Sequence, residues 1–239
     1  MMKRQLFAFC GALLLAVLFT PLAFGQTKAS AKAKATTAAL APVPRQLRRI
    51  TFLRIKSGMN AEWQEFRKNE SMPMYRKAGV KEQTVLAMSQ FGETGYLIAS
   101  PIESLAQYDG PGSASRALGQ EGAAAYVAKN TRFIESTHAL VLETRPELSM
   151  PPAQNYQAKL FVVTTTTVAP GRFEEYENYV KTALLPVIKQ AGPKGYLTSR
   201  VAYGGHTNQY MSAVFVESWA DLQRYREALA KAATAAKLI

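Results

Sequence analysis

An internal repeat is the feature that most constrains the fold of this chain. When Gly58 is aligned with Gly171, an offset of 113 residues, similar residues recur without a gap as far as Gly92 and Gly205. One residue is then inserted, because GETGY in the first copy becomes GHTNQY in the second, and the match continues at an offset of 114. Such a repeat predicts two copies of one structural module. The matched pairs are Glu62 with Glu175, Trp63 with Tyr176, Phe66 with Tyr179, Lys68 with Lys181, Pro73 with Pro186, Ala78-Gly79 with Ala191-Gly192, Lys81 with Lys194, Tyr96 with Tyr210, Ala99 with Ala213, Glu103-Ser104 with Glu217-Ser218, and Ala106 with Ala220.

Each copy has the pattern strand, helix, strand, strand, helix, and the first copy adds a fourth strand. This is the βαββαβ order of a ferredoxin-like module, in which two helices cover one face of a four-stranded antiparallel sheet. The other face must also be buried, and the second module is the obvious cover. The expected strands are 49–58, 84–91, 96–102 and 138–145 in the first copy and 159–171, 196–203 and 210–217 in the second; the expected helices are 60–79, 122–137, 173–192 and the segment after Glu217.

Proline, glycine and serine mark the ends and interruptions of the expected helices. Pro73 and Pro186 lie inside two helices at matched positions, so both helices should kink or restart there. Glycine at the end of each of these helices, Gly79 and Gly192, fits a C-terminal cap. Serine after each Glu-Ser junction is expected to be a structural N-cap rather than a functional residue.

The second copy is shorter than the first. The first runs 32 residues from Ala106 to His138, where its fourth strand is expected, whereas only 19 residues follow Ala220. The second copy therefore appears to lack its last strand: either the chain is truncated, or this module closes with three strands. Residues 159–168 would then form an exposed sheet edge, which is an aggregation hazard. We expect instability or partner pairing at that edge.

The N-terminus has the pattern of a secretory signal peptide. Lys3 and Arg4 precede a mostly apolar run, and small residues at Ala23 and Gly25 fit cleavage after Gly25. The alternative is a membrane anchor, but the apolar run is short against the ~20 residues that a bilayer span needs. The only cysteine, Cys10, lies in this segment. We therefore expect a secreted or periplasmic bacterial envelope protein without disulfides or a reactive thiol.

The expected domains are a signal peptide (1–25), a flexible basic tether (26–46), module 1 (47–146), a linker (147–158) and module 2 (159–239). Loss of the signal peptide lowers the formal charge from +12 to +10. The basic tether could make electrostatic contact with an anionic envelope surface, although a solvated linker explains it more simply. Nucleic acid is not an expected partner, since no motif for it is present.

These motifs bring the chain close to a known superfamily. The pattern G-x3-E-[WY]-x2-[FY], then Pro, then Ala-Gly, a glycine turn and VFVESWADL (214–222), resembles the dimeric α+β barrel superfamily. The nearest members are the antibiotic-biosynthesis-monooxygenase-like and NIPSNAP-like proteins. The resemblance implies two ferredoxin-like modules packed sheet to sheet. In the superfamily these usually come from two chains, whereas here both would lie in one chain, giving a monomeric pseudo-dimer or a homodimer.

The same resemblance yields candidate site residues. Cofactor-independent oxygenases of the superfamily resemble this chain at Trp219 and combine such a tryptophan with Asn or Arg, for which Asn178 and Arg200 are available. A packing role for Trp219 is favoured, as it is for Trp63 and Tyr176, because large aromatic residues dominate cores. His206 could act as a base or ligand at the barrel mouth, but polar residues are common in turns anyway.

Nothing in the sequence points to a metal or a bound cofactor, and we expect neither. His138 opens the expected fourth strand, and nothing singles it out as a haem ligand. Two functions remain. The first is a non-catalytic envelope protein that binds a small, partly apolar ligand or serves assembly. The alternative is a cofactor-independent monooxygenase-like enzyme acting on a small apolar molecule in the barrel cavity. A solvent-open cavity lined by Arg200 and Trp219 would favour the enzyme.

Overall fold

The computed structural model describes residues 15–18, 45–88, 95–154 and 156–238, with only the backbone considered for the first range. No helix in these ranges has the length and apolar character needed to span a bilayer. The strands are β1 Leu15–Leu18, β2 Leu47–Ile55, β3 Thr84–Met88, β4 Gly95–Ile102, β5 Ile134–Thr144, β6 Leu160–Thr167, β7 Gly195–Tyr203 and β8 Gln209–Val216. The α-helices are α1 Asn60–Phe66, α2 Met72–Lys77, α3 Ser113–Thr131, α4 Phe173–Tyr179, α5 Leu185–Ala191 and α6 Trp219–Ala235; π-helical turns are η1 Arg67–Ser71 and η4 Val180–Leu184, and short 3-10 helices are η2 Leu105–Tyr108 and η3 Pro146–Leu148.

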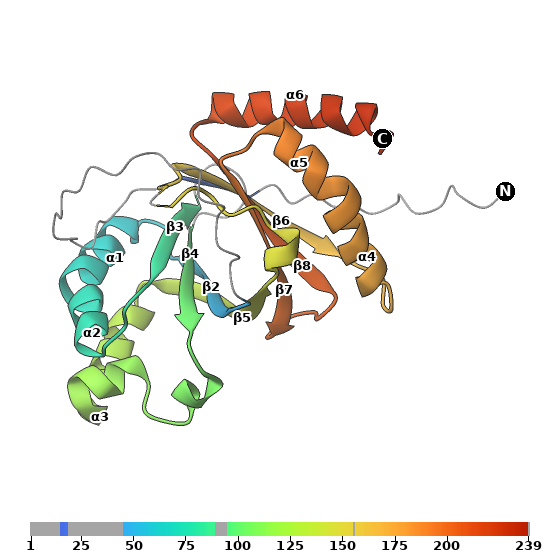
Figure 1. The fold of residues 1–239 in the computed structure, drawn as a ribbon. Helices are drawn as coiled ribbons and strands as arrows, with labels where there is room; N and C mark the ends of the chain where they lie inside the picture. Colours follow the sequence, from blue (N-terminus) through green and yellow to red (C-terminus); the bar gives the residue numbers. More distant parts are fainter. Residues whose placement is uncertain (1–14, 19–44, 89–94, 155, 239) are drawn as a thin grey trace, which may run out of the picture.

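The strands of both modules form one curled antiparallel sheet in the order β3-β4-β2-β5-β7-β8-β6. Within module 1 this is the predicted ferredoxin-like order, and module 2 repeats it with three strands. The pairing of β5 with β7, for example Leu142 opposite Val201, joins the two sheets. Figure 1 shows α1 to α3 on the outer side of module 1 and α4 to α6 on the outer side of module 2. The predicted tandem α+β barrel is therefore confirmed.

The eighth strand closes the barrel and comes from the N-terminal segment. β1 pairs antiparallel with β6 on one side and with β3 on the other. It stands where the missing fourth strand of module 2 belongs, since β5 flanks β2 in the same way in module 1. This corrects the expectation of a wholly exposed 159–168 edge, because Leu160–Val163 are paired on both sides. β1 lies within the predicted signal peptide, so closure by this strand requires the full-length chain.

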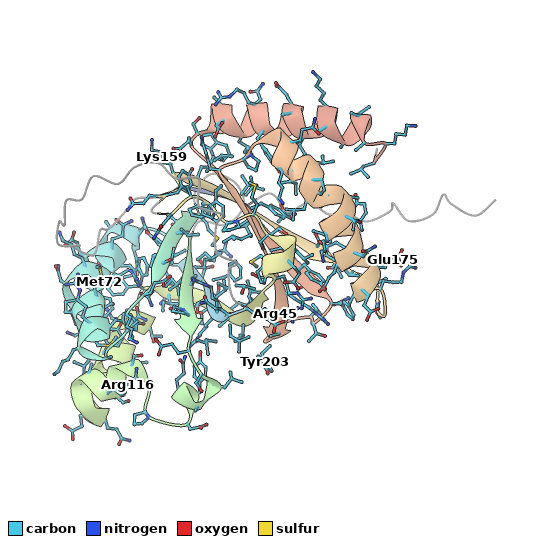
Figure 2. All side chains as sticks on the ribbon, in the orientation of Figure 1. Arg45, Met72, Arg116, Lys159, Glu175 and Tyr203 are labelled. Carbon is cyan, nitrogen blue, oxygen red and sulfur yellow. The ribbon has the colours of Figure 1, made fainter. Side chains whose placement is uncertain are left out.

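Two clusters of apolar side chains position the layers. The barrel interior is filled from both modules, because Phe161 and Met211 of module 2 pack against the module 1 cluster. A second layer lies between the module 1 sheet and its helices, where Trp63 and Phe66 of α1 are buried. Figure 2 shows side chains throughout the space between the helices and the sheet. The interior cluster comprises Ile50, Leu86, Met88, Leu97, Ala99, Leu140, Leu142 and Val201.

Both long helices restart at the predicted prolines, and each does so through a π-helical turn. η1 and η4 lie at matched positions of the repeat, and Pro73 and Pro186 stand in the first turn of α2 and α5. Proline has no N–H for the preceding turn, so the hydrogen-bond pattern must change there. The serine caps are also confirmed: Ser218 Oγ accepts from Asp221 N (3.1 Å) and Ser104 Oγ from Ala106 N (3.2 Å).

Two boundaries differ from the sequence expectation. α3 ends at Thr131 and β5 begins at Ile134, whereas a helix had been expected to continue through residue 137. Residues at the start of β5 pair with the end of β2, Ser136 opposite Arg54, so tertiary pairing outweighs local helix preference. The predicted linker is also ordered, because Leu148 is only 1 % exposed and Met150 pairs with Tyr196.

Candidate functional site

The residues predicted from the sequence do not gather into one site. Arg200 lies on β7, where its guanidinium carbon is 4.0 Å from the ring centroid of Phe173 and its Nε donates to the Thr207 carbonyl at 3.0 Å. His206 is exposed in the β7–β8 turn, as expected for a turn residue. Asn178 is exposed on α4. Arg200 thus packs on an aromatic ring and does not line a described cavity.

Trp219 lies at the opposite end of β8 from Arg200. Arg200 is opposite Tyr210, whereas Trp219 follows the far end of that strand as the first residue of α6. The separation along β8 is roughly 20 Å at about 3.3 Å per residue. Trp219 is 36 % exposed, so the expected packing role is wrong for this residue, whereas Trp63 is 3 % exposed and the expectation is confirmed.

A tyrosine on the third strand of each module makes the same contacts with the first helix. The ring centroids of Trp63 and Tyr96 are 4.2 Å apart in module 1, and those of Tyr176 and Tyr210 are 4.6 Å apart in module 2. The position after each helix aromatic meets the tyrosine hydroxyl. In module 1 this is neutral, because Gln64 Nε2 donates to Tyr96 Oη at 2.7 Å.

In module 2 the matched position is acidic, and its charge is balanced. Tyr210 Oη donates to Glu177 Oε1 at 2.6 Å, and Arg145 Nη2 donates to the other oxygen of Glu177. Arg145 Nε is also 3.0 Å from Glu147 Oε1, although the N–H is not aligned for a hydrogen bond. Arg45 pairs with Glu147 at 2.8 Å and is labelled in Figure 2, where it lies between the two modules. This network anchors the linker to module 2.

The charges of this network shift the ionisation of its members. Burial raises the pKa of Tyr210, and the carboxylate of Glu177 raises it further. Burial also acts to raise the pKa of Glu147, but its backbone hydrogen bond and the guanidinium groups of Arg145 and Arg45 outweigh this and lower it. The network is therefore a paired structural cluster, with each described cation facing a carboxylate.

Module 1 holds a buried cation without a carboxylate partner among the described residues. Arg67 is the first residue of η1 and is 9 % exposed. Its Nη2 donates to Gln83 Oε1 at 2.5 Å, and its guanidinium carbon lies 5.8 Å from the ring centroid of Trp63. Burial lowers the pKa of Arg67. A buried charge that lacks a counter-charge is costly, so this arrangement needs a physical explanation.

Aromatic and hydroxyl groups surround Arg67. The phenols of Tyr75, Tyr126 and Tyr96 are close enough to interact with its charge. Tyr126 Oη donates to Ser71 Oγ at 2.9 Å, and burial raises the pKa of Tyr126 to about 12, so the phenol stays neutral. Gln83 and Tyr75 are only half-buried, so this layer is partly open along β3.

A separate cleft of 350 Å³ lies on the outer surface of module 1 between α1 and the end of α3. It contains opposite charges that neutralise one another, as in the pair Lys129–Glu70 at 3.0 Å. None of Arg67, Arg200 and Trp219 lines it. No metal-binding group of three or more His, Cys, Asp or Glu occurs within the described ranges. The lining residues are Glu62, Glu65, Phe66, Asn69, Glu70, Lys129, Arg132 and Phe133.

Sequence reasoning missed Arg67, although the repeat carries a signal for it. At the offset of 113 residues, Arg67 matches Val180, which is 0 % exposed in module 2. A position that is a core valine in one copy and arginine in the other marks a cation on a buried helix face. The matched π-helical turns strengthen this signal, since π-bulges are frequent at functional sites.

Comparison with known proteins shows the fold. No protein-family model and no curated protein sequence matches the chain. A solved structure of a candidate monooxygenase from Fusobacterium nucleatum subsp. nucleatum matches with a TM-score of 0.53 at 11 % identity, covering 81 % of this chain and 86 % of that protein. An anthrone oxidase-like protein matches with a TM-score of 0.49 at 14 % identity, covering 82 % and 86 %.

A NIPSNAP domain protein from Burkholderia xenovorans covers 46 % of this chain and 99 % of its own, with a TM-score of 0.35 at 11 % identity. At these identities the similarity is one of fold alone. Together with the strand order, it shows that the chain has the dimeric α+β barrel fold of the monooxygenase-like and NIPSNAP proteins, with both halves of the barrel in one polypeptide.

Proposed function

We propose that this protein binds a small, partly aromatic ligand that carries a negative charge, without transforming it. The site is the layer between the helices and the sheet of module 1. One observation carries the proposal: the guanidinium of Arg67 is buried and has no carboxylate partner among the described residues. An anionic ligand would supply the missing counter-charge.

The surroundings of Arg67 favour an aromatic anion over a simple ion. Arginine presents a planar fork of N–H donors that suits carboxylates and phenolates, and only one edge of the fork is used by Gln83. Trp63 and the nearby tyrosines offer ring faces and edges for an aromatic group. Half-buried Gln83 and Tyr75 on the β3 side provide the direction of entry.

The N-terminal sequence supports a location for this activity. A positive start, an apolar run and small residues before Gly25 are typical of export, so we propose that binding takes place in the envelope or outside the cell. The basic segment 26–46 would keep the protein near anionic surfaces, where its excess positive charge also raises the local concentration of anionic ligands.

Native mass spectrometry tests the binding proposal. The protein would be produced with its own N-terminus, and the form that accumulates would be purified gently. We expect an adduct on the wild type that is retained by Lys68→Met and lost by Arg67→Met. Lys68 is the matched control because it is the neighbouring cation on the same helix and is exposed. An adduct that Arg67→Met retains would contradict the proposal.

A cofactor-independent monooxygenase is the second candidate. It is favoured by the position of Arg67 next to Trp63, since a cation beside an aromatic wall could hold a phenolic substrate as its anion. Against it, Arg200 and Trp219 line no common cavity. Oxygen uptake in the presence of a phenol, abolished by Arg67→Met and unaffected by Lys68→Met, would support the enzyme over the binding protein.

A further inference from the structure

One edge of the barrel is only half covered. β6 pairs with β8 over its whole length, from Leu160 opposite Val216 to Thr167 opposite Gln209. On its other side only Leu160–Val163 are paired, with β1. No strand of the described residues pairs with Thr164–Thr167 on that side. The matched strand of module 1, β2, is paired with β5 from Leu47 to Ile55.

The backbone of this uncovered half faces outward with free hydrogen-bonding groups. Val168 N donates to the Asn208 carbonyl at 2.8 Å, on the β8 side. Backbone groups of successive strand residues point to alternate sides in an antiparallel ladder. The N–H and C=O groups of Thr165 and Thr167 therefore point away from β8, toward the uncovered side.

The edge lacks every common protection against pairing. Natural sheets block their edges with charged residues, prolines, bulges or short strands. β6 reads LFVVTTTT, eight residues without charge or proline, and its pairing with β8 has no register shift. Threonine is a strong strand former, so an extended conformation of this segment is favoured.

We propose that β6 is a dimerisation edge, on which Thr164–Thr167 pairs antiparallel with the same segment of a second copy. The segment is self-complementary. About a two-fold axis at its centre, Thr164 faces the partner's Thr167 and Thr165 faces the partner's Thr166, so threonine meets threonine at every position. Such pairs contribute roughly 0.2–1 kcal/mol each. One surface serves both copies, as closed two-fold symmetry requires.

The N-terminal segment determines how long the dimer edge is. β1 covers Leu160–Val163 in the full-length chain and belongs to the predicted signal peptide. Its removal would extend the free edge from four residues to the eight of β6. The second copy rather than the segment 26–46 is the occupant, because the tether is basic and rich in alanine, whereas the threonine run matches itself.

Light scattering coupled to size exclusion tests the proposal on the protein form that accumulates, over a range of concentrations. We expect a dimer for the wild type and for Thr165→Val, which keeps the backbone N–H and the strand preference. Thr165→Pro removes a donor on the open side without removing a bond to β8, so its dimer dissociation constant should rise at least tenfold. Circular dichroism and the unfolding midpoint show whether this variant is folded.

Thr165→Lys provides a second variant that does not depend on proline geometry. Thr165 is exposed, so lysine fits without repacking, and it would place two like charges close together across the two-fold axis. We expect the same loss of dimer, reversed in part by high salt. A wild-type protein that stays monomeric at every concentration, or a Thr165→Lys variant that dimerises like the wild type, would overturn the proposal. Neither outcome depends on ligand binding at Arg67.

Discussion

At the scale of single residues, two matched positions separate the modules. Val180 is fully buried and packs with Leu148 and Tyr210, whereas its counterpart Arg67 puts a cation in the same place. One turn before it, module 2 has the acidic Glu177 where module 1 has Gln64. Module 2 therefore carries charges that neutralise each other, and module 1 carries a cation that needs a partner.

The pairing of Arg145 with Glu177 predicts a large effect on stability. Arg145→Met would leave a mostly buried carboxylate without its cation, which typically costs about 3–5 kcal/mol. Adding Glu177→Gln removes that charge, so the double variant should be more stable than Arg145→Met alone. Urea unfolding at neutral pH measures both. A double variant as unstable as the sum of the single variants would show that the two groups are not coupled.

The lowered pKa of Glu147 predicts loss of stability in acid. Because the pKa of Glu147 is lower in the folded protein than its ordinary 4.5, its contribution is present above that value. The contribution is lost as the pH falls through the folded pKa. Glu147→Gln should therefore narrow the difference in urea midpoint between neutral pH and acid. An unchanged pH dependence in this variant would contradict the assignment.

At the scale of elements, local signals located the helix caps and interruptions but not the strand partners. Pro73 and Pro186 marked the restart points because a missing N–H has a local effect. The start of β5 was misplaced, since Ser136 is held in a strand by β2, which lies far away in sequence. The strand position of β1 was also missed, because its apolar residues fit a signal peptide equally well.

The helix caps give a prediction at this scale. Ser218 caps the long helix α6 through Asp221 N, whereas Ser104 caps the short 3-10 helix η2. Ser218→Ala should lower the free energy of unfolding by about 1 kcal/mol. Ser104→Ala is the matched control and should cost less, because η2 contains no buried residue. Thermal unfolding compares the two, and equal losses would contradict this reading.

At the scale of the whole molecule, the repeat was sufficient to predict a tandem α+β barrel. The repeat length, the proline positions and the glycine turns all depend on local sequence and on symmetry. The candidate site was not predicted, because the sequence pointed to Trp219 and Arg200, which the fold sets at opposite ends of β8. Burial of Arg67 depends on how α1 and α3 pack on the sheet, which no local pattern encodes.

The central claim is that Arg67 forms an anion site in module 1, and calorimetric titration tests it most directly. Benzoate and related aromatic carboxylates would be titrated into the wild type, Arg67→Met and Lys68→Met, with the matching neutral amides as ligand controls. We predict binding of a carboxylate to the wild type and Lys68→Met, and at least tenfold weaker binding to Arg67→Met and of the amide. Equal affinity of Arg67→Met, or an amide that binds as tightly as its carboxylate, would contradict the claim.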